Sequence, residues 1–283
     1  MSIVPFEVRN LTFPLSPARA RFWVGGRKAV TAFWDMLSIF FPEGERFFIE
    51  SVNAHRQHVT DPALQQAVQK FCGQEGVHRR EHARYNETLA AFGYPVEEME
   101  RRVSRVLNVV RFLLPKRLQL AVTVSLEHFT ALLGELVLTS RTGLAGADPE
   151  VAKLWRWHSL EENEHKAVAF DVYRAAGGGY VERCVIMLLT SLIFWGKVVE
   201  QQARMMWADG TLFRLSEHAD LFRYLFRNND GGMQRLLPKY LSFFRRDFHP
   251  FAPGDTEQLE QWRAQLADLD SMAASSPANV STT

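Results

Sequence analysis

Two short stretches of the chain share one pattern, and this pattern decides the fold. The first is Gln74-Glu75-Gly76-Val77-His78, and the second is His158-Ser159-Leu160-Glu161-Glu162-Asn163-Glu164-His165. Each contains Glu-x-x-His, as Glu75 with His78 and as Glu162 with His165. Because residues three apart are neighbours on one helix face, each pair can offer a carboxylate and an imidazole to one metal ion.

Each pair follows another candidate carboxylate at a spacing of about 30 to 35 residues. Glu127 stands in an apolar run, where an unpaired carboxylate would be unfavourable without a metal ion. On the earlier helix we choose Glu45, with Glu43 beside Pro42 as the alternative. A four-helix bundle that binds two metal ions takes one Glu from each of two helices and Glu-x-x-His from each of the other two.

The helix faces carry more imidazoles than this pattern requires. At about 100° per residue, His82 and Tyr85 share the face of His78, and His158 shares the face of His165. We therefore predict His158 as an extra metal ligand and His82 as a further candidate, with an orienting role as the alternative for each. Tyr85 is a candidate proton or electron relay, and a packed tyrosine bonded to a Glu is the alternative.

The predicted ligands have mixed hard and borderline character and include no thiolate. This chemistry suits two iron ions, with manganese as a second choice and zinc as a poorer one. A carboxylate that bridges two divalent ions is neutralised by them, which allows several carboxylates to share a buried site. The ligand set comprises Glu45, Glu75, His78, Glu127, Glu162 and His165, with His158 and His82 added.

Composition limits the classes of protein to which the chain can belong. Its 283 residues are 47% hydrophobic and carry a net charge of +1, which argues against a nucleic-acid binder. The two cysteines, Cys72 and Cys184, cannot form a disulfide framework, so we expect a reducing compartment. Residues 1–9 lack the pattern of a secretory signal. We expect a cytoplasmic protein, with the inner face of the membrane as an alternative location.

The helical pattern predicts an all-α, ferritin-like four-helix bundle with additional C-terminal helices. The first helix should start at Lys28 and bend at Pro42, and Asp61-Pro62 and Asp148-Pro149 are typical helix starts. The helix that starts at Asp148-Pro149 should continue to about Gly177. The expected organisation is an irregular lead-in at 1–27, the metal-binding bundle at 28–180, a helical extension at 181–270 and a disordered tail at 271–283.

The C-terminal extension contains an apolar segment at 185–196 that is too short to span a bilayer by itself. Aromatic and basic residues are mixed downstream, for example in the segment 239–246. This mixture suits peripheral membrane contact through 181–246. We slightly prefer the alternative of buried amphipathic helices with extended arginine side chains. A homodimer is also left open.

At these residues the chain resembles the ferritin-like di-iron carboxylate superfamily, over roughly residues 28–177. It resembles still more closely a bacterial family labelled predicted metal-dependent hydrolases. Its His-x-x-x-Glu-x-x-His stretch is similar to that of di-iron arylamine N-oxygenases, which implies that His158 binds iron. The matching segments are Phe41-Pro42-Glu43-Gly44-Glu45-Arg46-Phe47-Phe48, residues 74–78, Leu126-Glu127-His128-Phe129-Thr130, Trp155-Arg156-Trp157-His158 and residues 161–171.

These observations predict a metal-dependent enzyme. Our leading hypothesis is a non-haem di-iron oxidoreductase that activates O2 to oxidise a small organic, apolar substrate. The first alternative is a hydrolase in which two metal ions activate water. The second alternative is a non-enzymatic iron-binding or membrane-associated protein.

Overall fold

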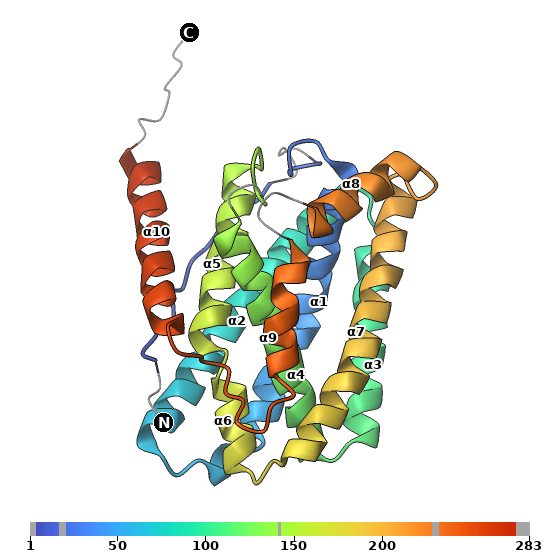
Figure 1. The fold of residues 1–283 in the computed structure, drawn as a ribbon. Coiled ribbons are helices and arrows are strands. Elements are labelled where there is room, and N and C mark those ends of the chain that lie inside the picture. Colours follow the sequence, from blue (N-terminus) through green and yellow to red (C-terminus); the bar gives the residue numbers. More distant parts are fainter. Residues whose placement is uncertain (1–3, 17–20, 141–142, 228–231, 276–283) are drawn as a thin grey trace.

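The computed structural model describes residues 4–16, 21–140, 143–227 and 232–275, and within these ranges the chain forms helices and no strand. Two helical hairpins form a ferritin-like four-helix bundle, with α1 against α2 and α4 against α5 (Figure 1). The predicted fold class is therefore confirmed. The bundle helices are α1 (Lys28–Asn53), α2 (Pro62–Ala91), α4 (Lys116–Thr139) and α5 (Pro149–His165), with η1 (Arg56–His58) between α1 and α2 and α3 (Val96–Leu113) between the hairpins.

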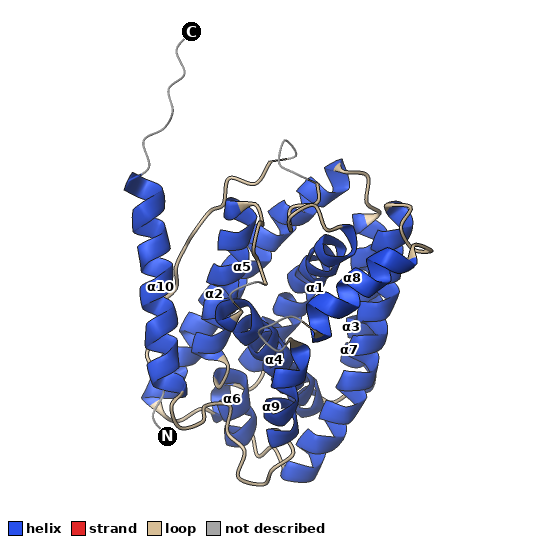
Figure 2. Cartoon of the chain, turned by 45° about the horizontal axis from the view of Figure 1, so that its top comes forward, coloured by secondary structure: helices blue, strands red, loops and turns tan. Residues whose placement is uncertain are grey.

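The C-terminal helices pack around this bundle. Helix α7 lies along α1 and α4, α8 packs on α1, and α10 packs on α5 (Figures 1 and 2). Helix α10 continues past the expected boundary at 270, and residues 276–283 of the expected tail lie outside the described part. The remaining elements are α6 (Val168–Ala175), α7 (Tyr180–Ala208), α8 (Leu215–Phe226), η2 (Met233–Leu236), α9 (Leu237–Ser242) and α10 (Asp255–Ser275).

Both predicted Asp-Pro helix starts are confirmed. The Asp61 side chain accepts a hydrogen bond from the backbone N–H of Ala63, and Asp148 accepts from Glu150 and Val151. Such caps stabilise a helix by about 0.5–2 kcal/mol because the first N–H groups have no partner inside the helix. They fix where α2 and α5 begin, and so the phase of both metal-binding stripes.

Helix α1 runs through Pro42, the residue at which the sequence predicts a bend within the helix. Proline has no N–H, so the carbonyl of Ser38 loses its partner within the helix. The Asn86 amide of α2 donates to this carbonyl at 3.4 Å, and the Ser38 hydroxyl donates to the Asn86 side chain at 2.8 Å. A neighbouring helix thus supplies the missing bond, and α1 continues to Asn53.

The helix predicted from Asp148 to about Gly177 is two helices. Helix α5 ends at His165, and α6 begins at Val168. Between them, the Lys166 ammonium forms a 2.6 Å ion pair with Asp255 at the start of α10. The interruption leaves His165 in the last turn of α5.

The apolar core is divided into two clusters by a polar layer. One cluster surrounds Trp34, Trp155 and Trp157, and the other surrounds Phe47 and Phe71. The predicted ligands lie at positions between these clusters along all four bundle helices. The charges in a buried layer of this kind must be compensated by partner groups or bound cations.

Two of the described helices, α4 and α7, are long and apolar enough to cross a membrane by length and composition alone. Helix α4 is mostly buried inside the bundle, whereas α7 is mostly exposed. One side of α7, including Ile186 and Met187, packs into the core. The other side carries exposed apolar residues such as Leu188 and Leu192.

Candidate metal centre

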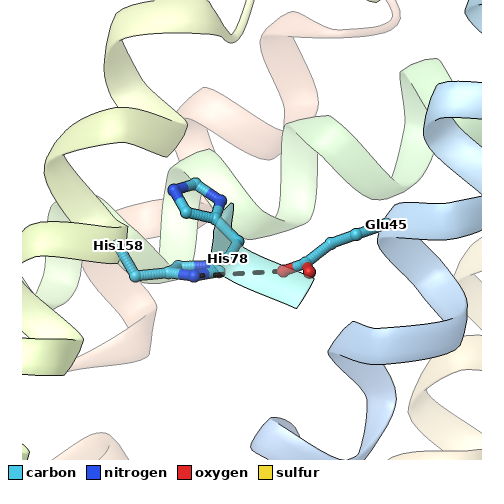
Figure 3. A group of neighbouring side chains, drawn as sticks. All are labelled: Glu45, His78 and His158. Atoms are coloured by element: carbon cyan, nitrogen blue, oxygen red, sulfur yellow. Dashed lines mark ion pairs between the residues drawn. The ribbon is translucent and has the colours of Figure 1, made fainter. Parts of the chain in front are cut away.

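Seven of the predicted ligands converge in the polar layer between the two core clusters. Each is at most 3% exposed. Figure 3 shows three of them, from α1, α2 and α5: Glu45 and His158 point toward each other, and the ring of His78 lies beside that of His158, with centroids 4.3 Å apart. The seven residues are Glu45 on α1, Glu75 and His78 on α2, Glu127 on α4, and His158, Glu162 and His165 on α5.

The first half of the site contains Glu45, His78 and His158. One ligand atom from each lies within 4.8 Å of the others. The Nδ1 of His158 lies 4.0 Å from Glu45 Oε1. The same Glu162 oxygen, Oε1, lies 3.5 Å from His78 Nδ1 and 3.3 Å from His158 Nε2.

The second half contains Glu75, Glu127 and His165. The Nε2 of His165 lies 3.1 Å from Glu75 Oε1 and 3.5 Å from Glu127 Oε2. The other oxygen of Glu162, Oε2, lies 3.7 Å from the same nitrogen. Glu162 therefore faces both halves with different oxygens, as a carboxylate between two metal ions would.

The atoms that face the centre of the site lack hydrogen-bond partners in the described part of the chain. They include both carboxylate oxygens of Glu45, Glu75, Glu127 and Glu162. One nitrogen of each of the three imidazoles also lacks a hydrogen-bond partner: His78 Nδ1, His158 Nε2 and His165 Nε2. Buried polar atoms are normally satisfied, and these point toward one common space. The residues present therefore fit two divalent cations with oxygen and imidazole ligands.

The opposite nitrogen of each imidazole has a partner. His78 Nε2 lies 2.9 Å from Glu161, and His165 Nδ1 lies 2.9 Å from the Gln74 side chain. His158 Nδ1 lies 3.1 Å from His82 Nε2. Metal-binding imidazoles are commonly oriented in this way, because the outer partner fixes the ring and its tautomer.

His82 lies behind His158 and away from the unpartnered ligand atoms. Its Nε2 contacts His158, and its Nδ1 lies 2.9 Å from the Ser38 hydroxyl. Both nitrogens are thus engaged within the protein. The position suits the orienting role more closely than that of a ligand.

Tyr85 lies further along α2 and donates a hydrogen bond to Asp35, which also accepts from Trp23 Nε1 at 2.8 Å. The hydrogen-bond partner of Tyr85 is therefore an Asp and not one of the seven ligands.

Glu43, the alternative first-helix ligand, is partly exposed and lies 3.8 Å from the Arg46 guanidinium. Glu45 is the residue that enters the site.

The structure adds a charged support that the motifs did not reveal. Arg9, from the irregular N-terminal segment, contacts Glu161 at 3.0 Å and Glu164 at 2.7 Å. Arg263 of α10 contacts Glu164 at 2.7 Å from the other side. Glu164 in turn accepts from Gln74, the partner of His165. Only the tertiary fold brings these arginines to α5, so no local signal could have identified them.

Burial dominates the protonation of the carboxylic acids in the site. Loss of water raises the pKa of Glu45, Glu75 and Glu127, and for Glu127 the pKa reaches about 8. Burial would lower the pKa of His78, but the hydrogen bond with Glu161 and the carboxylate of Glu162, 3.5 Å away, raise it to about 10. In the absence of a cation, the site therefore holds protons at neutral pH.

This proton load predicts how metal affinity depends on pH. Metal ions bind deprotonated ligands and must displace these protons, so the affinity for Mn(II) should rise as pH increases from 6 to 8. Isothermal titration in buffers of different ionisation enthalpy should detect proton release. The Glu127→Gln variant should release fewer protons, and Glu43→Gln should release as many as the wild type. An affinity that falls with rising pH would contradict this account of the site.

A largely apolar cavity of about 320 Å³ leads from the protein surface to this centre. Its walls come from α1, α3, α4, α5 and α7, and His158 and Ser159 lie among its lining residues. Phe41 also lines it and packs on His158 with ring centroids 4.4 Å apart. At the surface the cavity is bordered by Leu113 and Leu189. Its volume is within the range of small-molecule sites.

Comparison with known proteins gives one match. The family described as predicted metal-dependent hydrolases matches residues 7–253, which includes every ligand of the candidate centre. No curated protein and no solved structure matches the chain. With a match over most of its length, the chain belongs to the family of predicted metal-dependent hydrolases.

Proposed function

We propose that this protein is a di-iron oxidoreductase that uses O2 to oxidise a small apolar substrate. The observation that carries the proposal is the apolar cavity that ends at His158. A substrate held there would lie beside the first half of the site. The reaction would place one oxygen atom on the substrate and reduce the other to water, with two electrons from an external donor and two protons from solvent.

Glu45, His78 and His158 would hold one iron ion, and Glu75, Glu127 and His165 would hold the other, with Glu162 between them. Bound iron would supply the redox chemistry with O2. The extra imidazole of His158 gives the first half a second nitrogen ligand. This is the position at which the chain resembles the arylamine N-oxygenases.

The remaining residues would orient the ligands and keep water out. His82, Glu161 and Gln74 hold the three imidazoles in place. Phe41 covers His82 and His158 on the cavity side, with ring centroids 4.5 and 4.4 Å away. A dry site strengthens electrostatic interactions and limits side reactions with solvent.

The cavity wall favours an apolar substrate over a polar one. Hydrolysis develops negative charge on a substrate oxygen, which two bound metal ions could stabilise, so the wall bears on the substrate rather than on the reaction. Among the described residues, a single Lys or Arg, Lys197, lines the cavity, and it forms a 2.6 Å ion pair with Glu200. Oxidation of a C–H or N–H bond requires mainly positioning, which an apolar wall supplies.

The test is anaerobic loading with Fe(II), followed by exposure to O2 in a stopped-flow spectrophotometer. The proposal expects O2 consumption together with a transient visible absorption, and both should disappear in the Glu127→Ala variant. Absence of O2 consumption by protein that contains two irons per chain would end the oxidoreductase proposal.

The family match favours a second candidate, a hydrolase in which two metal ions activate water. Activity toward apolar esters with redox-inert Zn(II) or Mg(II) would support it. A strict requirement for iron and O2 would exclude it. The same metal-loaded preparations serve both tests, so the two candidates can be compared directly.

A further inference from the structure

We propose that the surface of α3 and α7 around the cavity mouth docks on an anionic phospholipid bilayer, from which an aliphatic chain enters the cavity. The identity of the chain as substrate rests on the proposed function, whereas the docking does not. We call this surface the docking face. It is defined by Phe112 and Leu113 on α3 and by Val185, Leu188, Leu189 and Leu192 on α7.

The docking face is apolar on both helices that border the cavity mouth. Phe112 is 88% exposed, Leu192 is 75% exposed and Leu113 is 65% exposed. On α7, Leu188 and Leu189 each lie three or four residues from Val185 and Leu192, so the four residues form one stripe on the side opposite Ile186 and Met187. Single exposed leucines are common, but a contiguous patch of this kind marks an interaction surface.

The mouth of the cavity opens within this face. Leu113 and Leu189 are exposed and also line the cavity. Ion pairs join α3 to α7 near the other end, Arg102 to Glu200 at 3.0 Å and Glu98 to Arg204 at 3.2 Å. In both views α3 and α7 lie on the same side of the bundle (Figures 1 and 2). An apolar chain could therefore pass from the docking face into the cavity without crossing water.

A group of cationic residues adjoins the start of α7. Arg117 pairs with Glu182 at 2.9 Å, and Arg246 lies over the ring of Tyr180. Arg245 pairs with Asp247, which leaves an excess of positive charge in the group. Its exposed members are Lys116, Arg117, Arg174, Arg245 and Arg246 against two carboxylates, Glu182 and Asp247. Anionic headgroups are attracted to such clusters by about 1 kcal/mol per basic residue near the surface.

This charge favours a bilayer over a second copy of the chain. A symmetric dimer through the docking face would bring identical surfaces together. The two basic groups would then lie near one another, and the cavity mouths would be closed. An anionic bilayer matches both the apolar stripe and the adjoining cations.

Vesicle flotation tests the proposal. Metal-loaded wild-type protein should float with vesicles of phosphatidylcholine and phosphatidylglycerol, and about tenfold less with phosphatidylcholine alone, because the cations require anionic headgroups. The double variant Leu188→Glu with Leu192→Glu should lose binding. The matched control, Gln66→Glu with Gln69→Glu, adds the same charge on the exposed side of α2 and should bind like the wild type.

Two further measurements keep the test decisive. Circular dichroism must show that the double variant folds, and Arg245→Gln with Arg246→Gln should weaken flotation independently. The proposal would be overturned if wild-type protein did not bind anionic vesicles. It would also be overturned if the wild type formed a dimer and the Leu188→Glu and Leu192→Glu changes dissociated that dimer. Since no step uses turnover, failure of the docking is distinguishable from failure of the proposed chemistry.

Discussion

Replacing Glu162 by alanine is expected to lower the affinity for both metal ions by at least about 100-fold. Changes to residues that merely orient ligands lower affinity by about 10–100-fold, and Glu162 lies among the ligands themselves. Burial would raise the pKa of this carboxyl, but its contacts with His158, His165 and His78 lower it well below the usual value. Glu162 is thus a charged group that faces both halves of the site, and Glu75 likewise has an oxygen within 4.8 Å of ligand atoms of His78 as well as of His165.

Metal analysis by mass spectrometry after anaerobic Fe(II) loading measures this effect. The matched control is Glu43→Ala, on α1 near Glu45, because Glu43 is partly exposed and faces Arg46. The control should retain two ions per chain. Retention of both ions by Glu162→Ala would show that the metals bind elsewhere, or that Glu162 does not lie between them.

The features that could be predicted from the sequence are local ones. The Glu-x-x-His pairs lie on single helices, so helical periodicity alone places Glu75 beside His78 and Glu162 beside His165. Asp61 and Asp148 mark helix starts because a cap depends on neighbouring backbone groups. Glu127 could be selected because a lone carboxylate in an apolar run requires a partner.

The features that could not be predicted depend on contacts between distant segments. Pro42 leaves the Ser38 carbonyl without its partner inside α1, and Asn86 on another helix supplies a bond to that carbonyl. Arg9 reaches Glu161 from a segment without regular structure. His82 has the helical phase of a ligand, yet the packing of α5 places His158 in front of it. Periodicity gives the direction of a side chain, but it does not give the distance to the next helix.

The Gly44→Leu variant is expected to lose binding of apolar ligands while it retains both metal ions. Gly44 lines the cavity on α1, and a Cβ added there meets no atom within 4 Å. The leucine side chain can therefore occupy the cavity without displacing the backbone. Leucine also favours a helix more than glycine does, so stability should not decrease.

The matched control is Gly76→Leu on α2. This glycine also adjoins a ligand Glu, a Cβ there likewise meets nothing, and the position is exposed to solvent. With the fluorescent fatty acid cis-parinaric acid, Gly44→Leu should raise Kd by at least about tenfold, since a group comparable to a leucine side chain is excluded from apolar contact. Gly76→Leu should leave Kd unchanged. Equal affinity in the wild type and both variants would mean that the fatty acid binds outside the cavity, and the cavity could then no longer be regarded as the route to His158.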